Sequence, residues 1–405
     1  MEAQSSPDGN HTLLPAVFLS TFFIRLGFGL TLSIYAFYLG SDVETVGLTA
    51  AASPLVEASV VLFAGMAADR YGRLPVLRGG LVAGAILLLL MSTTRLPLYQ
   101  TVLSALFGLT SASILAASLA VTGDVSGKGE RGLEMGRFDA VNLAGWVFGF
   151  SLGYILVSAL HGQQHPANLS VVFWIGAGAV VLALAILLWL SRGHVERRQE
   201  GVADPKRLKE ALLRPAILLV VVPWAAIYML LGALFTFLGT AAATYSIAPW
   251  ELGTAIAVGG TLLLFTQPWY GKLADRLGRG RIMLVGILGF LGVLGFGTAI
   301  VLYGLEGWRV GFLGGIGISA IAALAFGPSS LAALTDASRR ISRATTMALY
   351  SMTIAGGMAL GLISSSILYQ AFGTNGVVIF FGLVGGILTV ATLVRLHYQR
   401  LGVSP

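Results

Sequence analysis

The chain has 405 residues, of which 56% are hydrophobic and only 11% are charged. A chain of this composition lacks the polar surface that a soluble globular protein needs, so most of its surface must face lipid. The absence of cysteine excludes disulfides and thiolate metal sites. A net charge of +7 would suit a nucleic-acid-binding protein, but the positions of the charges argue against that class.

Apolar segments follow one another along the chain, each long enough to cross roughly 30 Å of hydrocarbon at about 1.5 Å per residue. No cleavable signal peptide is expected, because the first apolar segment is too long for one. The sequence predicts an all-α integral membrane protein with twelve spans, near residues 13–39, 45–68, 74–93, 96–122, 134–160, 168–191, 215–241, 248–273, 282–303, 308–335, 344–371 and 375–396.

The basic residues orient these spans. If both termini are cytoplasmic, every Lys and Arg except Arg25, Arg95 and Arg309 falls on the cytoplasmic side. This distribution satisfies the positive-inside rule and excludes the opposite orientation, as well as a basic nucleic-acid surface. We therefore expect a multi-pass protein of the cell membrane, embedded in the lipid bilayer as a monomer and binding no nucleic acid.

Two charged residues lie deep in the first two spans. Arg25 is about 18 Å from the cytoplasmic end of span 1, and Glu57 reaches a similar depth in span 2. Because these spans are sequential and antiparallel, the two side chains can meet near the midplane. Each buried charge costs about 2.5–3.5 kcal/mol on insertion scales, so such residues usually have a partner or a function.

The pair has two interpretations. Burial favours the neutral carboxylic acid of Glu57, whereas Arg25 favours its carboxylate, so the pair could act as a proton-coupling switch or bind substrate. Alternatively, it is a permanent ion pair that fixes helix packing. A proton gradient would supply the energy in the first case, and no cofactor is expected. Asp139, near the cytoplasmic end of span 5, could assist Glu57 or join the polar network of Asp69 at the inner side.

A charged motif occurs twice, at matching places in the two halves. Both copies follow the pattern G-x-x-A-D-R-x-G-R between two apolar segments, and a duplicated polar hinge of this kind indicates a transporter built from repeats. The glycines allow close packing and a sharp turn, the aspartates can face a helix N-terminus, and the arginines can bind anionic headgroups or acids. The motif residues are Gly65, Asp69, Arg70, Gly72, Arg73, Gly271, Asp275, Arg276, Gly278 and Arg279.

A mixed-charge segment divides the chain between the two copies. It predicts an N-terminal bundle of six helices over residues 1–191, a cytoplasmic linker over 192–214 and a C-terminal bundle of six helices over 215–405. Two parallel repeats of six spans imply two bundles around a central cavity, related by an axis along the membrane normal.

These features together resemble the major facilitator superfamily, and the resemblance covers essentially the whole chain. It implies that the motifs latch the two bundles on the cytoplasmic side, with Asp69 near Arg343 and Asp275 near Gly132. It also implies that spans 1, 4, 7 and 10 line the cavity for a small-molecule substrate. Together with Gln267 of span 8, the cavity candidates are Ser33, Tyr35, Thr110, Ser111, Trp224, Tyr228, Phe235, Ser319 and Phe326.

An aromatic and hydroxyl lining with one charged pair suits a bulky amphipathic or lipophilic solute, which predicts proton-coupled export like that of multidrug exporters. Two departures from the exporter pattern leave the direction open: Ser104 stands where those exporters carry Arg, and Phe150 follows Gly149 where they carry Pro. Uptake of a polar nutrient and flipping of a lipid-linked molecule are the alternatives. A sensor or scaffold would need an appended signalling domain, which the sequence does not show. An enzyme is disfavoured because the sequence shows no metal-ligand cluster and no phosphate-binding loop.

Overall fold

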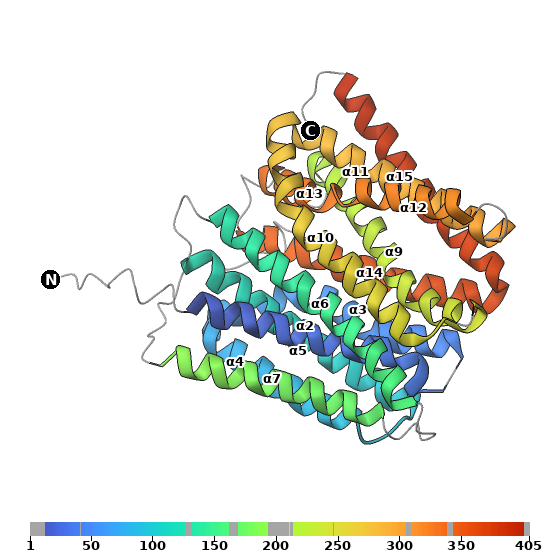
Figure 1. Cartoon of the computed structure of the whole chain (residues 1–405). Coiled ribbons are helices and arrows are strands. Elements are labelled where there is room, and N and C mark those ends of the chain that lie inside the picture. Colours follow the sequence, from blue (N-terminus) through green and yellow to red (C-terminus); the bar gives the residue numbers. More distant parts are fainter. Residues whose placement is uncertain are drawn as a thin grey trace. The chain divides into compact units, whose positions relative to one another are not determined.

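The computed structural model describes residues 13–40, 42–125, 131–161, 169–192, 210, 214–245, 247–304, 309–337 and 343–400. Every regular element within these ranges is a helix, which confirms the predicted all-α fold (Figure 1). The helices are α2 (Leu13–Tyr38), α3 (Val43–Tyr71), α4 (Arg73–Met91), α5 (Pro97–Val125), α6 (Arg131–His161), α7 (Ser170–Leu190), α9 (Pro215–Tyr245), α10 (Pro249–Leu277), α11 (Arg279–Tyr303), α12 (Arg309–Ala323), α13 (Phe326–Ala337), α14 (Arg343–Phe372) and α15 (Thr374–Arg400).

Ten helices in the described ranges are long and apolar enough to cross a membrane. The predicted spans 248–273 and 308–335 do not qualify. Helix α10, at the first of these, carries polar and charged residues at both ends, from Glu251 to Arg276. The second is divided between α12 and α13 by Leu324 and Ala325, so neither part is long enough alone. Twelve membrane crossings therefore remain a prediction.

The chain forms two compact units, and three helices contribute to both. Unit 1 comprises the described parts of residues 1–41, 52–203 and 238–261, and unit 2 comprises those of 42–51, 204–237 and 262–405. The start of α3 thus groups with unit 2, whereas the end of α9 and the start of α10 group with unit 1. The predicted division into residues 1–191, 192–214 and 215–405, with six helices on each side, remains a prediction.

Helix α2 lies at the centre of unit 1, where it packs against α5, α6 and α7. Small residues bring α2 and α6 together: a Cβ added at Gly149 would lie 2.5 Å from the Leu26 carbonyl oxygen, and one at Gly145 would lie 2.5 Å from that of Phe22. Such close backbone approach is the usual basis of helix association in lipid. The start of α10 also packs on α6, where Ser151 Oγ donates to the Gly253 carbonyl at 2.6 Å.

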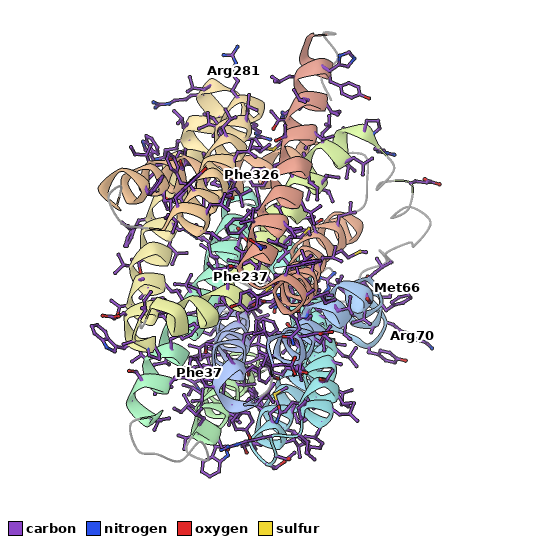
Figure 2. All side chains as sticks on the ribbon, turned by 90° about the vertical axis from the view of Figure 1, so that its right-hand side faces the viewer. Phe37, Met66, Arg70, Phe237, Arg281 and Phe326 are labelled. Carbon is purple, nitrogen blue, oxygen red and sulfur yellow. The ribbon has the colours of Figure 1, made fainter. Side chains whose placement is uncertain are left out.

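In unit 2, α11 packs against α12, α13 and α15, and α14 packs against α15. Phe237 of α9 contacts Phe380 and Phe381 of α15, with ring centroids 5.8 and 6.1 Å apart. Phe326 is buried in unit 2, whereas Arg281 projects outward from the start of α11 (Figure 2). Apolar and aromatic side chains thus hold unit 2 together. Among the described residues of unit 2, no ion pair lies in the interior.

Candidate functional site

The interior of unit 1 contains a two-pronged ion pair. Arg25 Nη2 donates to Glu57 Oε1 at 2.7 Å, and Arg25 Nη1 donates to Glu57 Oε2 at 2.9 Å. Both residues are only 2% exposed. This paired geometry is the strongest arrangement that an arginine and a carboxylate adopt, and it links α2 to α3. The structure therefore brings together the two deep charges that the sequence placed at similar depth.

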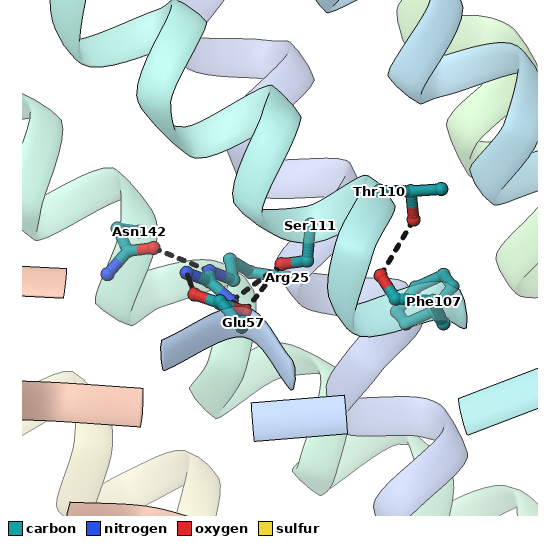
Figure 3. A network of polar contacts seen from close by, with 6 residues as sticks. All are labelled: Arg25, Glu57, Phe107, Thr110, Ser111 and Asn142. Carbon is teal, nitrogen blue, oxygen red and sulfur yellow. Dashed lines mark hydrogen bonds and ion pairs between the residues drawn. The ribbon is translucent and has the colours of Figure 1, made fainter. Parts of the chain in front are cut away.

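Two neutral side chains complete this network (Figure 3). Ser111 Oγ of α5 donates to Glu57 Oε2 at 2.7 Å and accepts from Arg25 Nη1 at 3.0 Å. Arg25 Nε donates to Asn142 Oδ1 of α6 at 2.8 Å. The guanidinium also lies 5.5 Å from the centre of the Trp146 ring, within the range of cation–π attraction. Four helices thus converge on one buried cation.

Sequence reasoning selected Ser111 as a cavity residue but missed Asn142 and Trp146. Asn142 lies three residues after Asp139 on α6. A polar amide inside a predicted span, like a charged residue, indicates a candidate functional position, so Asn142 could have been selected from the sequence. Asp139 itself is half-buried. Its neighbour Arg137 pairs with Glu134 at 2.6 Å, in the first turn of the same helix.

The two copies of the charged motif fold in the same way. Gly72 and Gly278 precede α4 and α11 with φ angles of 99° and 94°, a conformation that favours glycine and produces the predicted sharp turn. In each copy the aspartate pairs with the second arginine, Asp69 with Arg73 at 3.8 Å and Asp275 with Arg279 at 3.6 Å.

The remaining motif residues are more open. The side chain of Arg70 is exposed and stacks on Tyr71 at 5.5 Å, and Arg276 is also exposed. A Cβ added at Gly65 or Gly271 would meet no atom of the described chain within 4 Å, so close packing at these two glycines is absent there. The predicted contacts with Arg343 and Gly132 involve residues whose surroundings lie outside the described set, and the latch role stays a prediction.

The cavity candidates of unit 1 point into the bundle. The Thr110 hydroxyl donates to the Phe107 carbonyl of its own helix at 2.7 Å. Ser33 donates to the Leu30 carbonyl at 2.8 Å and packs against Gly153 of α6. Tyr35 is fully buried. A role for these residues in substrate binding remains untested.

The candidates of unit 2 form an aromatic cluster. The Trp224 ring lies 6.4 Å from that of Phe326 and 5.5 Å from that of Tyr350. The Cβ atom of Tyr228 packs near Gly357. Ser319 faces Gly292 of α11. Phe235 is half-buried on α9.

A break between α12 and α13 lies beside these residues. The Ala325 amide bonds to the Ala322 carbonyl at 3.1 Å instead of continuing the α-helical ladder to Ile321. The Tyr270 hydroxyl of α10 donates to the freed Ile321 carbonyl at 2.7 Å. Gln267, one turn earlier on α10, lies next to Gly327 of α13. A discontinuous helix therefore stands at one predicted cavity wall of unit 2.

The sequence matches the family model of the Major Facilitator Superfamily over residues 16–296 and 242–403. The chain belongs to the Major Facilitator Superfamily. No curated protein matches it significantly. Membership of this superfamily of transporters agrees with the apolar helices, and identifies the chain as a multi-pass membrane protein.

Solved structures share the fold of this superfamily member at low sequence identity. A POT family transporter in complex with a thioalcohol-conjugated peptide has 14% identity and a TM-score of 0.74, with 96% of each chain covered. The nucleoside transporter NupG has 16% identity and a TM-score of 0.67, with 96% of this chain and 98% of that chain covered. At such identities the similarity shows the fold alone.

Among the described residues, no group of three or more His, Asp or Glu side chains could hold a metal ion. The Arg25–Glu57 network supplies the polar groups of the candidate site. The network contains one acid that can gain a proton, one permanent cation and two neutral hydrogen-bonding groups.

Proposed function

We propose that this superfamily member is a proton-coupled secondary transporter in which Glu57 is the group that gains and loses the proton. It works in the cell membrane with both termini in the cytoplasm, and the proton gradient is its energy source. The substrate class that we favour is a lipophilic or amphipathic small molecule, which the transporter exports.

The observation that supports the coupling role is the pair of neutral acceptors around Arg25. When Glu57 is a carboxylate, it neutralises the guanidinium through two hydrogen bonds. When Glu57 gains a proton, Ser111 Oγ and Asn142 Oδ1 still accept from the guanidinium, and the Trp146 ring still faces it. The site therefore provides partners for the cation in both protonation states, which a purely structural ion pair does not need.

The aromatic cluster of unit 2 supports the substrate class. Trp224 and Phe326 supply large apolar surfaces, and both are buried in unit 2. Uptake of a polar nutrient is the second candidate, because the amides of Asn142 and Gln267 add hydrogen-bonding capacity, and because the similar solved structures are nucleoside and peptide transporters.

The first experiment separates the substrate classes. Purified protein is tested by thermal shift with ethidium, a lipophilic cation, and with uridine, a dipeptide and glucose. Stabilisation by ethidium alone supports export of an amphipathic solute, whereas stabilisation only by the polar compounds overturns that choice in favour of uptake.

The second experiment tests coupling. Flux of the stabilising compound is measured in proteoliposomes with and without an imposed pH gradient, for the wild type and Glu57→Gln. We expect the gradient to drive wild-type flux and to have no effect on the variant. Glu251→Gln, at an exposed site on α10, is the matched control and should behave like the wild type. Equal flux with and without the gradient in the wild type contradicts the proposal.

A further inference from the structure

Five buried polar atoms of unit 1 have no hydrogen-bond partner in the described structure. Two of them are Arg78 Nε, near the start of α4, and Ser118 Oγ, in the last third of α5, and the other three are Gln100 Oε1, the Tyr35 hydroxyl and Ser53 Oγ. Gln100 and Tyr35 are 0% exposed and Ser53 is 2% exposed. A buried polar group without a partner is costly, so these three atoms require an explanation.

The three residues lie at neighbouring turns of α2, α3 and α5. Gln100 and Ser104 are one turn apart on α5, and the Tyr35 hydroxyl approaches the Ser104 hydroxyl without the geometry of a full hydrogen bond. One turn after Ser104, the backbones of α5 and α3 meet at Gly108 and Ser53.

From Ser53, one further turn of α3 leads to Glu57. Two turns of α5 lead from Ser104 to Ser111, so the row ends at the hydrogen bond between Ser111 and Glu57. The order is therefore Gln100, then Tyr35 with Ser104, then Ser53, then the ion pair.

The other end of this row lies at the connection between α4 and α5. Gln100 Nε2 donates to the carbonyls of Met91 and Thr94 at 2.7 and 2.5 Å. Thr94 is half-exposed. Under the orientation predicted by the charges this connection is extracellular. The row thus runs from the outer surface to the buried carboxylate.

The spacing of the row suits water. Consecutive groups are separated by about one helical turn, or roughly 5.4 Å. A single water that forms hydrogen bonds of about 2.8 Å on each side spans that distance. Buried waters occupy polar sites where they form hydrogen bonds with groups that otherwise have no partner. The three atoms of this row are such groups.

We propose that Gln100, Tyr35, Ser104 and Ser53 hold a file of ordered waters that delivers protons from the outer side to Glu57. The inference rests on the proposed function, because the file matters only if Glu57 exchanges protons. Each hydroxyl accepts a hydrogen bond from one water and donates one to the next, so a proton moves inward by exchange along the file and ends on a Glu57 oxygen. Tyr35 and Ser53 are positioning residues, since they hold the waters that the proton crosses.

The test is time-resolved infrared spectroscopy of the full chain in proteoliposomes after an acid pulse on the outer side. Glu57→Gln identifies the band of the protonated Glu57 carboxyl. We expect Tyr35→Phe and Ser53→Ala to slow the appearance of this band about tenfold, the effect of about 1.4 kcal/mol on a barrier, while the final pH titration of the band stays unchanged. If Tyr35 and Ser53 had only a structural role, the substitutions would shift the pH titration of the Glu57 band or leave the rate of its appearance unchanged.

Tyr38→Phe is the matched control. Tyr38 is also buried in α2 and shares two carbonyl acceptors with Gln100, those of Met91 at 3.1 Å and Thr94 at 3.3 Å. Because its hydroxyl already has these protein partners, it needs no water of the file. Its rate should equal that of the wild type. An unchanged rate in both Tyr35→Phe and Ser53→Ala overturns the file alone, whereas the absence of a Glu57 band in the wild type overturns both the file and the proposed function.

Radiolytic hydroxyl labelling provides a measurement that needs no variant. Water in the file produces labelling of Tyr35 despite its full burial, well above that of Phe173, which is 1% exposed and packs on Tyr38. Equal, background labelling of both residues shows a dry interface and overturns the proposal.

Discussion

At the scale of single residues, the Arg25 guanidinium determines the character of the site. Its Nε and both Nη atoms donate to described partners, namely Asn142, Ser111 and Glu57. Burying two opposite charges is costly, so the pair contributes little net stability compared with apolar residues of the same shape. Its retention inside a membrane bundle is better explained by function than by packing.

This argument predicts opposite results for single and double substitutions. Glu57→Ala leaves the Arg25 cation buried without its counterion and should destabilise the protein by about 3–5 kcal/mol. Arg25→Met combined with Glu57→Leu removes both charges and should restore stability to near that of the wild type, while proton-driven flux is lost. Unfolding in detergent by urea measures the free energies, and a double variant as unstable as Glu57→Ala would contradict the argument.

At the scale of elements, the contact between α2 and α6 depends on glycine. A Cβ at position 149 would lie 2.5 Å from the Leu26 carbonyl oxygen and 3.0 Å from the Gly29 Cα. Gly178 of α7 offers the opposite case, because a Cβ there meets nothing within 4 Å in the described chain.

We therefore expect Gly149→Ala to destabilise the protein by about 1–3 kcal/mol, since the two backbones must move apart. Gly178→Ala should be neutral or stabilise by up to about 1 kcal/mol, because alanine is the better helix former. Thermal unfolding of both variants in the same detergent makes the comparison. A loss of stability at position 178 equal to that at 149 would show that helix contact is not the cause.

The break between α12 and α13 is the second feature at this scale. Tyr270→Phe removes the donor to the partly buried Ile321 carbonyl, at a cost of about 1 kcal/mol. We expect faster hydrogen exchange in residues 321–328 and no change in α4. Tyr71→Phe, at a side chain that is 66% exposed, is the control. Unchanged exchange near Ile321 would mean that the Tyr270 hydroxyl does not stabilise the break.

Particular residues show how far the sequence determined this architecture. The depth of Arg25 and Glu57 along adjacent antiparallel spans was enough to suggest that they meet. The contribution of Asn142 was not predictable, because it depends on which face α6 turns toward α2. The break at Leu324 was also missed, because Leu324 and Ala325 are ordinary helix formers within an apolar run.

At the scale of the whole molecule, the distribution of basic residues predicts the membrane orientation. The chain has no cysteine, so single cysteines can be introduced without background. Thr93→Cys in the connection between α4 and α5 should react with a membrane-impermeant maleimide on intact cells. Arg281→Cys at the start of α11 should react only after permeabilisation. The reverse pattern would contradict the predicted orientation.

The sequence by itself determined the membrane class, the helical fold and the duplication, because composition and apolar periodicity act locally along the chain. It also placed the two deep charges. Only the tertiary structure decided that Ser111 and Asn142 share the Arg25 cation, and that the Tyr35 and Ser53 hydroxyls form no full hydrogen bond with the described residues. These facts depend on which helix faces meet in space, a choice made by packing between distant segments.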